Sequence, residues 1–219
     1  MTSQPGHGTG APGGPWGERA PPTWIEDSGG SSDPAASNAP WPEELVVLLD
    51  EQGRPVGTMP KAEVHGTDTP LHLAFSVYVF DSGGSLLVTR RALGKRTWPG
   101  VWTNSCCGHP APGEEPAAAA RRRLGQELGL RPTRLELVLP SFAYRAVAPD
   151  GMVEHEVCPV FFAHLDGDPA PAPAADPEEV AEWRWVPWAA FRTLAATAPW
   201  ALSPWAVEQV RQLPAQAPA

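Results

Sequence analysis

Positive charge is scarce in this chain. Its 219 residues include 16 lysines and arginines against 25 aspartates and glutamates, which gives a net charge of −9 at pH 7. A protein that binds nucleic acid through the phosphate backbone needs a broad excess of lysine and arginine. The composition therefore argues against a nucleic-acid partner, and local groups of cations such as the one at residues 90–96 become more informative.

Cysteine and long apolar runs are also scarce. The 3 cysteines, two of them adjacent, do not make a disulfide framework, and no Cys-x-x-Cys pairs suggest a structural zinc site. The chain has no run of about 18 uncharged apolar residues, and its start has no apolar core of the length that a secretion signal needs. We therefore expect a soluble, cytoplasmic protein with no membrane partner.

The first 41 residues have few of the large aliphatic side chains that a folded core requires. Gly, Pro, Ser and Ala dominate them, so apolar burial cannot offset the loss of chain entropy. We predict a disordered tail at 1–41, one folded domain at 42–213 and a disordered end at 214–219. Trp16 and Trp24 could make the tail a docking peptide, but a dispensable extension is the simpler interpretation.

From residue 45 onward the sequence predicts strands with few helices between them. Apolar runs bounded by turn residues predict strands at 45–49, 55–61, 72–80, 86–90, 135–147, 152–165 and 180–186. Helices are predicted at 115–128, 188–195 and 204–213. This order is typical of an α/β fold in which helices sandwich a mixed β-sheet.

The predicted helix at 115–128 has a clear start and end. Pro116 can occupy its first turn, where a missing N–H costs nothing, and Gly129 can take the left-handed conformation that ends a helix. Residues three or four apart predict a buried face made of Ala117, Ala120, Leu124 and Leu128. We place on the remaining surface Arg121, Arg122, Gln126 and Glu127.

Residues 103–109 bring thiols and a histidine together ahead of this helix. If the segment is extended, its side chains alternate between two faces. One face carries Thr103, Ser105, Cys107 and His109, and the other carries Asn104 and Cys106. A thiol and an imidazole would then lie side by side. Cys107 could also be a small core residue and nothing more.

Side chains suited to bind a metal are spread over three segments. Glu154 and Glu156 share one face of a predicted strand, and carboxylates so close repel unless a cation lies between them or one takes a proton. The loop from His65 to His72 could fold both imidazoles inward. With His109 they form a nitrogen and oxygen set suited to octahedral Mn²⁺ or Mg²⁺, or to Zn²⁺. A solvated strand face and a hydrogen-bonded surface histidine are the plainer alternatives.

The order of residues from Gly108 to Leu130 resembles the Nudix box, a loop-helix-loop that presents carboxylates to a divalent cation bound to a diphosphate. The box expects glutamates where this chain has Arg123 and Gln126, so Glu127 alone remains of the helix's catalytic carboxylates. The resemblance therefore implies diphosphate binding and argues against hydrolysis. Glu127 could instead pair with Arg123 one turn earlier.

A more specific motif precedes the helix. Residues 97–110 read T-W-P-G-V-W-T-N-S-C-C-G-H-P, which looks like the type 1 isopentenyl-diphosphate isomerases of the Nudix superfamily. The likeness extends from about Glu44 to Arg211. It implies a single Nudix-like α/β domain. It also implies an isomerase of isoprenoid biosynthesis that interconverts isopentenyl and dimethylallyl diphosphate by metal-dependent 1,3-allylic proton transfer through a tertiary carbocation.

The resemblance also implies roles for the residues that match the family's positions. The matching catalytic residues are Cys107, Glu156, Tyr144 and Trp205. The matching substrate-binding residues are Lys61, Arg91 and Lys95. A Mn²⁺, Mg²⁺ or Zn²⁺ ion would be held by His65, His72, His109, Glu154 and Glu156, and a Mg²⁺ that bridges the diphosphate by Glu127. The sequence does not distinguish which residue of the Cys107 and Glu156 pair protonates the alkene.

Two other functions stay open at this point. A Nudix pyrophosphohydrolase would need the box glutamates that this chain lacks. A non-catalytic diphosphate-binding module would tolerate the loss of Cys107 or Glu156, and both are present. For the isomerase we expect a small prenyl diphosphate as the binding partner and a monomer or weak homodimer as the assembly.

Overall fold

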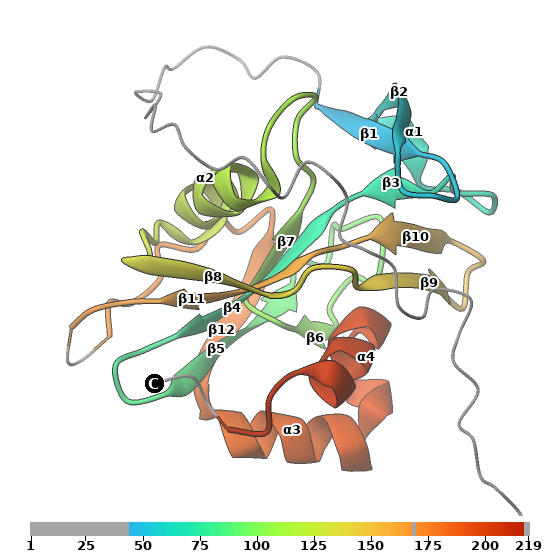
Figure 1. The fold of residues 1–219 in the computed structure, drawn as a ribbon. Coiled ribbons are helices and arrows are strands. Elements are labelled where there is room, and N and C mark those ends of the chain that lie inside the picture. Colours follow the sequence, from blue (N-terminus) through green and yellow to red (C-terminus); the bar gives the residue numbers. More distant parts are fainter. Residues whose placement is uncertain (1–43, 168–169, 217–219) are drawn as a thin grey trace, which may run out of the picture.

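The computed structural model describes residues 44–167 and 170–216 (Figure 1). The predicted tail at 1–41 lies outside the described residues. The strands are β1 (Leu45–Leu49), β2 (Pro55–Pro60), β3 (His72–Leu73), β4 (Phe75–Phe80), β5 (Ser85–Arg91), β6 (Trp102–Thr103), β7 (Cys106–Gly108), β8 (Arg134–Leu139), β9 (Ala143–Val147), β10 (Val153–Val157), β11 (Val160–His164) and β12 (Val180–Pro187). The helices are α1 (Lys61–Val64), α2 (Pro116–Leu128), α3 (Trp188–Thr197), the 3₁₀ helix η2 (Pro199–Ala201) and α4 (Pro204–Gln212).

These strands form two sheets. The smaller sheet has the order β2-β1-β3-β10-β9, and the larger one has the order β12-β5-β4-β11-β8, with β6 paired to β5 and β7 to β4. Strand β10 is parallel to β3 and β11 is parallel to β4, while the other pairs are antiparallel. The predicted α/β class with mixed pairing is therefore confirmed, although one predicted sheet is in fact two.

Three strands that the sequence predicted as continuous are divided between the two sheets. Each of the predicted strands breaks where the chain leaves one sheet for the other, and the breaks lie at 74, 140–142 and 158–159. At one of these crossings Ala74 N–H donates to the Val157 carbonyl at 2.9 Å, and Ser76 N–H donates to the Pro159 carbonyl at 3.0 Å. Pro159 has no N–H to donate, so a regular ladder cannot continue through it.

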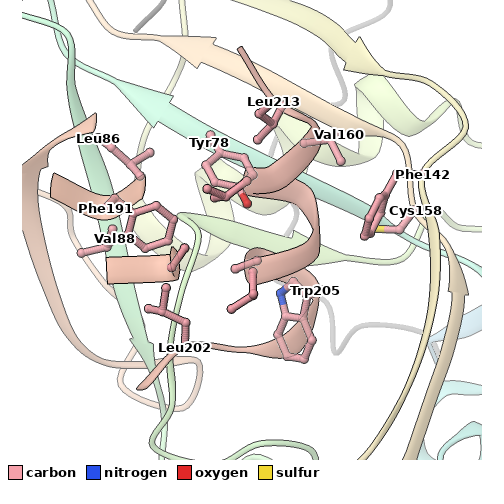
Figure 2. Close-up of a cluster of buried hydrophobic side chains, with 14 of the residues drawn as sticks. Tyr78, Leu86, Val88, Phe142, Cys158, Val160, Phe191, Leu202, Trp205 and Leu213 are labelled. Atoms are coloured by element: carbon pink, nitrogen blue, oxygen red, sulfur yellow. The ribbon is translucent and has the colours of Figure 1, made fainter. Parts of the chain in front are cut away.

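Helices cover both faces of the larger sheet, with α2 on one side and α3 and α4 on the other (Figure 1). Strand β4 is buried along its whole length for this reason. Its residues Val77 and Val79 belong to the core cluster with α2, and Tyr78 and Phe80 to the cluster with α3 and α4. Figure 2 shows the second cluster, in which Tyr78 lies close to the helices that carry Phe191 and Trp205.

Helix α2 has the predicted ends and most of the predicted buried face. It begins at Pro116 and ends at Leu128, with Gly129 as its C-cap at a φ of 65°. Ala120, Leu124 and Leu128 are fully buried, as predicted. Ala117 is exposed, and Glu127, expected on the surface, is 6% exposed. The apolar periodicity misses Arg123 and Glu127 because these residues pair with each other one turn apart, which allows both charged groups to be buried.

Replacing either of two glycines near α2 by alanine is expected to change the free energy of unfolding, in opposite directions at the two positions. At Gly129 a Cβ would add strain at a φ of +65° and lie 2.9 Å from Ala174 Cβ, so Gly129→Ala is expected to lower the free energy of unfolding by about 1–2 kcal/mol. Gly125 lies inside α2 with open space around it, so Gly125→Ala is expected to raise that free energy by roughly 0.5–1 kcal/mol. Urea unfolding of both variants measures the difference. Equal effects would contradict this account.

The chain packs against α3 beyond the predicted domain end at 213. The Pro214 carbonyl accepts hydrogen bonds from Trp188 Nε1 at 3.1 Å and from an Arg192 nitrogen at 3.2 Å.

Among residues 44–167 and 170–216, no helix has the length and apolar character needed to cross a membrane.

Candidate active site and metal centre

One pocket, with a volume of about 950 Å³, collects most of the residues that the sequence singled out. The predicted site residues that line it are Lys61, His65, Arg91, Lys95, Cys107, His109, Glu127, Tyr144, Glu154, Glu156 and Trp205. His72 is fully buried behind this lining, with its ring centre 5.2 Å from that of His65 and 5.1 Å from that of His109. Both sheets contribute, because Cys107 lies on β7 and Glu156 on β10.

The predicted metal ligands form a compact group at this pocket. One donor atom from each of His65, His72, His109 and Glu156 lies within 4.8 Å of the others. Glu154 joins the group through His65, since its Oε2 is 3.0 Å from His65 Nε2. Both glutamates are about 5–6% exposed, which excludes a solvated strand face. The parallel pairing of β10 with β3 sets Glu156 beside His72.

The hydrogen bonds of His72 show that this group suits a cation. His72 Nδ1 donates to the Pro70 carbonyl at 2.9 Å, so the lone pair of the neutral ring is at Nε2. That Nε2 lies 3.4 Å from Glu156 Oε1 and makes no hydrogen bond. Two buried acceptors that face each other are unfavourable unless a cation lies between them or one takes a proton. Burial of His72 lowers the pKa of its imidazole, but the contact with Glu156 outweighs it and raises that pKa. Three imidazoles and two carboxylates therefore fit a divalent metal ion.

The protonation states of His109 and Glu156 also suit metal binding. Burial lowers the pKa of His109 to about 4, so its imidazole is neutral at pH 7. Burial opposes ionisation of Glu156, but its contacts with His109 and His72 hold the pKa of that carboxyl well below its usual value. Tyr144 OH donates to Glu156 Oε2 at 2.9 Å. Neutral imidazoles and an ionised carboxylate are the forms that ligate metals.

Cys107 lies in the same pocket with its sulfur between two polar side chains. Its thiol donates to Asn104 Oδ1 at 3.2 Å, and Ser76 Oγ lies 3.4 Å from the sulfur. Burial raises the pKa of the Cys107 thiol to about 11, although hydrogen bonding to Ser76 and Asn104 acts in the opposite direction. The thiol therefore carries its hydrogen at neutral pH.

The predicted alternation through residues 103–109 is right at Cys107 and wrong at two residues before it. Cys106 faces α2, where its thiol donates to Glu127 Oε2 at 3.4 Å. Asn104 reaches Cys107 instead of pointing away, and Ser105 Oγ is buried against the backbone, where it donates to the Leu87 carbonyl. The chain bends between β6 and β7, each of which pairs with a different strand, so strict alternation does not hold there.

The rings of Tyr144 and Trp205 form another part of the pocket wall. The ring centre of Trp205 is 5.9 Å from that of Tyr144 and 5.6 Å from that of Trp98, which packs edge-on. Trp98 has a φ of 43°, an unusual conformation for a bulky residue. The Arg91 guanidinium lies 5.4 Å from the centre of the Trp205 ring and donates to the Thr97 carbonyl.

Paired cations line the pocket as well. The ion pairs are Lys61 with Glu44, Lys95 with Glu179, and Arg123 with Glu127, Glu179 and Glu44. Glu127 thus makes the contact with Arg123 that the sequence allowed as an alternative. Sequence reasoning missed Glu44 and Glu179, because they approach Lys61, Lys95 and Arg123 from segments that are distant in the chain.

Comparison with known proteins shows the family to which this chain belongs. A family model described as NUDIX domain matches residues 70–206. A relative from Frankia alni named Isopentenyl-diphosphate Delta-isomerase is 64% identical over 168 residues, which cover 77% of this chain and 84% of the relative. A relative of the same name from Mycolicibacterium vanbaalenii is 58% identical over 172 residues, which cover 78% of this chain and 92% of the relative.

Solved structures show the same fold at much lower identity. A protein from Deinococcus radiodurans matches with a TM-score of 0.59 and 19% identity over 78% of this chain and 99% of its own. A MutT protein from Methanosarcina mazei matches with a TM-score of 0.51 and 15% identity over 65% of this chain and 91% of its own. At these identities the likeness concerns the fold alone.

Proposed function

Since the chain belongs to the Nudix family and, within it, to the isopentenyl-diphosphate Delta-isomerases, we propose that its pocket interconverts isopentenyl and dimethylallyl diphosphate. The enzyme is an isomerase, and the reaction moves a carbon–carbon double bond by one position. A proton is added to the terminal carbon of the alkene and another is removed from C2, so the atoms balance without a redox partner. The intermediate between these two steps is a tertiary carbocation.

The observation that supports this proposal most directly is the placement of Cys107 and Glu156 in one pocket. The two side chains come from strands of different sheets, and the rings of Tyr144 and Trp205 line the pocket with them. An unactivated alkene is a poor base, so the reaction needs a positioned acid, a positioned base and protection from water. We assign Cys107 and Glu156 as the pair that transfers the two protons.

Tyr144 and Trp205 support this pair in different ways. The Tyr144 hydroxyl donates to Glu156 at 2.9 Å and so orients the carboxylate. The Trp205 ring is 2% exposed, lines the pocket and has the Arg91 guanidinium over its face at 5.4 Å from the ring centre, so this face can accept a cation. A desolvated cation on such a face gains roughly 2 kcal/mol or more.

We propose that His65, His72, His109, Glu154 and Glu156 hold a divalent ion, which can be Mn²⁺, Mg²⁺ or Zn²⁺. The support is the compact donor group and the unpaired Nε2 of His72. When bound, the ion supplies positive charge that fixes the position and the basicity of the Glu156 carboxylate. Glu127 would hold a Mg²⁺ against the diphosphate, because Mg²⁺ takes few protein ligands and fills its shell with water and phosphate oxygens.

Diphosphate binding is assigned to Lys61, Arg91 and Lys95. All three line the pocket, and Lys61 and Lys95 form ion pairs with Glu44 and Glu179. A five-carbon tail offers little surface, so most of the affinity has to come from charged contacts with the phosphates. The substrate class that fits is therefore a short prenyl diphosphate.

Incubation with isopentenyl diphosphate in deuterated water tests the proposal. Dimethylallyl diphosphate that carries deuterium is expected, and NMR of the product locates the label. Release of inorganic phosphate instead would support a pyrophosphohydrolase. The absence of both products, with substrate bound, would support a non-catalytic module.

A further inference from the structure

Asn104 lies behind the proposed proton-transfer residue and is fully buried. Its side-chain Nδ2 donates to the Val77 carbonyl at 3.0 Å and to the Cys106 carbonyl at 2.9 Å. A carbonyl can only accept, so these two bonds fix which end of the amide is nitrogen. The opposite end, Oδ1, is therefore an acceptor with a fixed position.

Hydrogen-bond donors from three segments converge on this oxygen. The Cys107 thiol lies 3.2 Å from it, Trp205 Nε1 3.1 Å and Thr103 Oγ1 2.8 Å. Thr103 Oγ1 lies 2.7 Å from Ser203 Oγ, the side chain that caps the start of α4. The acceptor thus joins the strand that carries Cys107 to the helix that carries Trp205.

We propose that Asn104 is a positioning residue for proton transfer at Cys107. Its Oδ1 holds the thiol hydrogen and the indole N–H at one point, so the sulfur and the aromatic wall keep a fixed relative geometry. Ser76 contacts the sulfur from another direction and is itself held by Gln209 Nε2 at 2.9 Å. Cys107 therefore has few rotamers open to it, which favours reaction because a small misplacement of reacting groups is costly.

Asn104→Ala tests this role against a matched control. Loss of the acceptor is expected to lower kcat on the order of 100-fold, with KM changed less than about threefold, because substrate binding does not involve Asn104. The control is Ser105→Ala, which removes a neighbouring side chain that is 1% exposed and makes hydrogen bonds to the backbone at Val79 and Leu87. This side chain makes no hydrogen bond to Cys107 or Trp205, so its loss is expected to lower stability and to leave kcat within about threefold of the native value.

A second variant covers the case in which the alanine protein does not fold. In Asn104→Ser the hydroxyl can donate to one of the two carbonyls but is one bond shorter than the amide, so it does not replace Oδ1. The same fall in kcat is expected, measured on protein with native circular dichroism and native metal content. A kcat within about threefold of native in either folded variant would overturn the proposal, as would an equal fall in Ser105→Ala.

This inference rests on the proposed role of Cys107, and the outcomes separate the two. If Cys107→Ala keeps its turnover, the proposed proton-transfer pair fails and the role of Asn104 fails with it. If Cys107→Ala is inactive while Asn104→Ala turns over normally, only the positioning role fails. A raised KM with unchanged kcat in Asn104→Ala would assign Asn104 to substrate binding and also overturn the positioning role.

Discussion

Cys107→Ala is expected to lower kcat by about 10²- to 10⁴-fold, the range that a positioned acid or base contributes. The physical reason is that the Cys107 thiol carries its hydrogen at neutral pH and is held at the same Asn104 oxygen as the Trp205 indole, so it is positioned as an acid in the pocket. Deuterium incorporation into the product measures the rate. Metal content is expected to stay native, because the sulfur is outside the metal ligand group.

Cys158→Ala is the matched control for this prediction. Cys158 is 1% exposed and its sulfur lies 3.3 Å from the same Ser76 hydroxyl, but it does not line the pocket. Its replacement is expected to leave kcat within a few-fold of native. Glu156→Gln is expected to lose turnover as completely as Cys107→Ala and to lose metal as well, since Glu156 belongs to both groups. Near-native turnover in Cys107→Ala would remove the proposed pair.

Removal of the metal is expected to abolish turnover and to lower the melting temperature. Without a cation, His72 Nε2 is left buried without a hydrogen-bond partner, 3.4 Å from Glu156 Oε1, which destabilises the folded state. At a free-ion concentration of 100 times the dissociation constant, binding contributes about 2.7 kcal/mol to the free energy of unfolding. Dialysis against a chelator, followed by thermal unfolding and assay, measures both effects, and readdition of Mn²⁺, Mg²⁺ or Zn²⁺ restores them.

Two histidine variants show whether this effect belongs to the proposed site. His65→Ala removes a ligand and is expected to lower the metal content and turnover together. His155→Ala replaces the histidine between the two glutamates of β10, which is outside the ligand group, and is expected to keep both. Unchanged melting temperature and turnover after complete chelation would rule out the metal centre.

The Nudix box of this chain differs from that of a hydrolase in the charges that its helix α2 carries. Arg123 stands where the box expects a glutamate, and it pairs with Glu127, Glu179 and Glu44. The helix therefore presents one neutralised carboxylate to the pocket and not a cluster of them. A hydrolase that activates water through several metal-bound carboxylates lacks its ligands here, which agrees with the isomerase function of the family.

Several features of the fold could be predicted because they depend on neighbours in the chain. The start of α2 follows from the proline at 116 and its end from the glycine at 129. Strand β1 follows from a short apolar run before a turn. The proposed metal ligands could be grouped from the sequence because all five match positions of the family, but the distances between them could not be predicted.

The sequence by itself determined the family and most of the elements, and it supplied the proposal for which side chains react. Tertiary structure decided where strands 72–80, 135–147 and 152–165 break, because a strand has to end where its pairing partner changes sheets. It also decided that Glu127 and Arg123 are buried and that Asn104 turns toward Cys107. Apolar periodicity in the sequence predicts which face of an isolated helix or strand is buried. Whether a charged or amide side chain is buried also depends on hydrogen-bond and ion-pair partners in other segments of the chain.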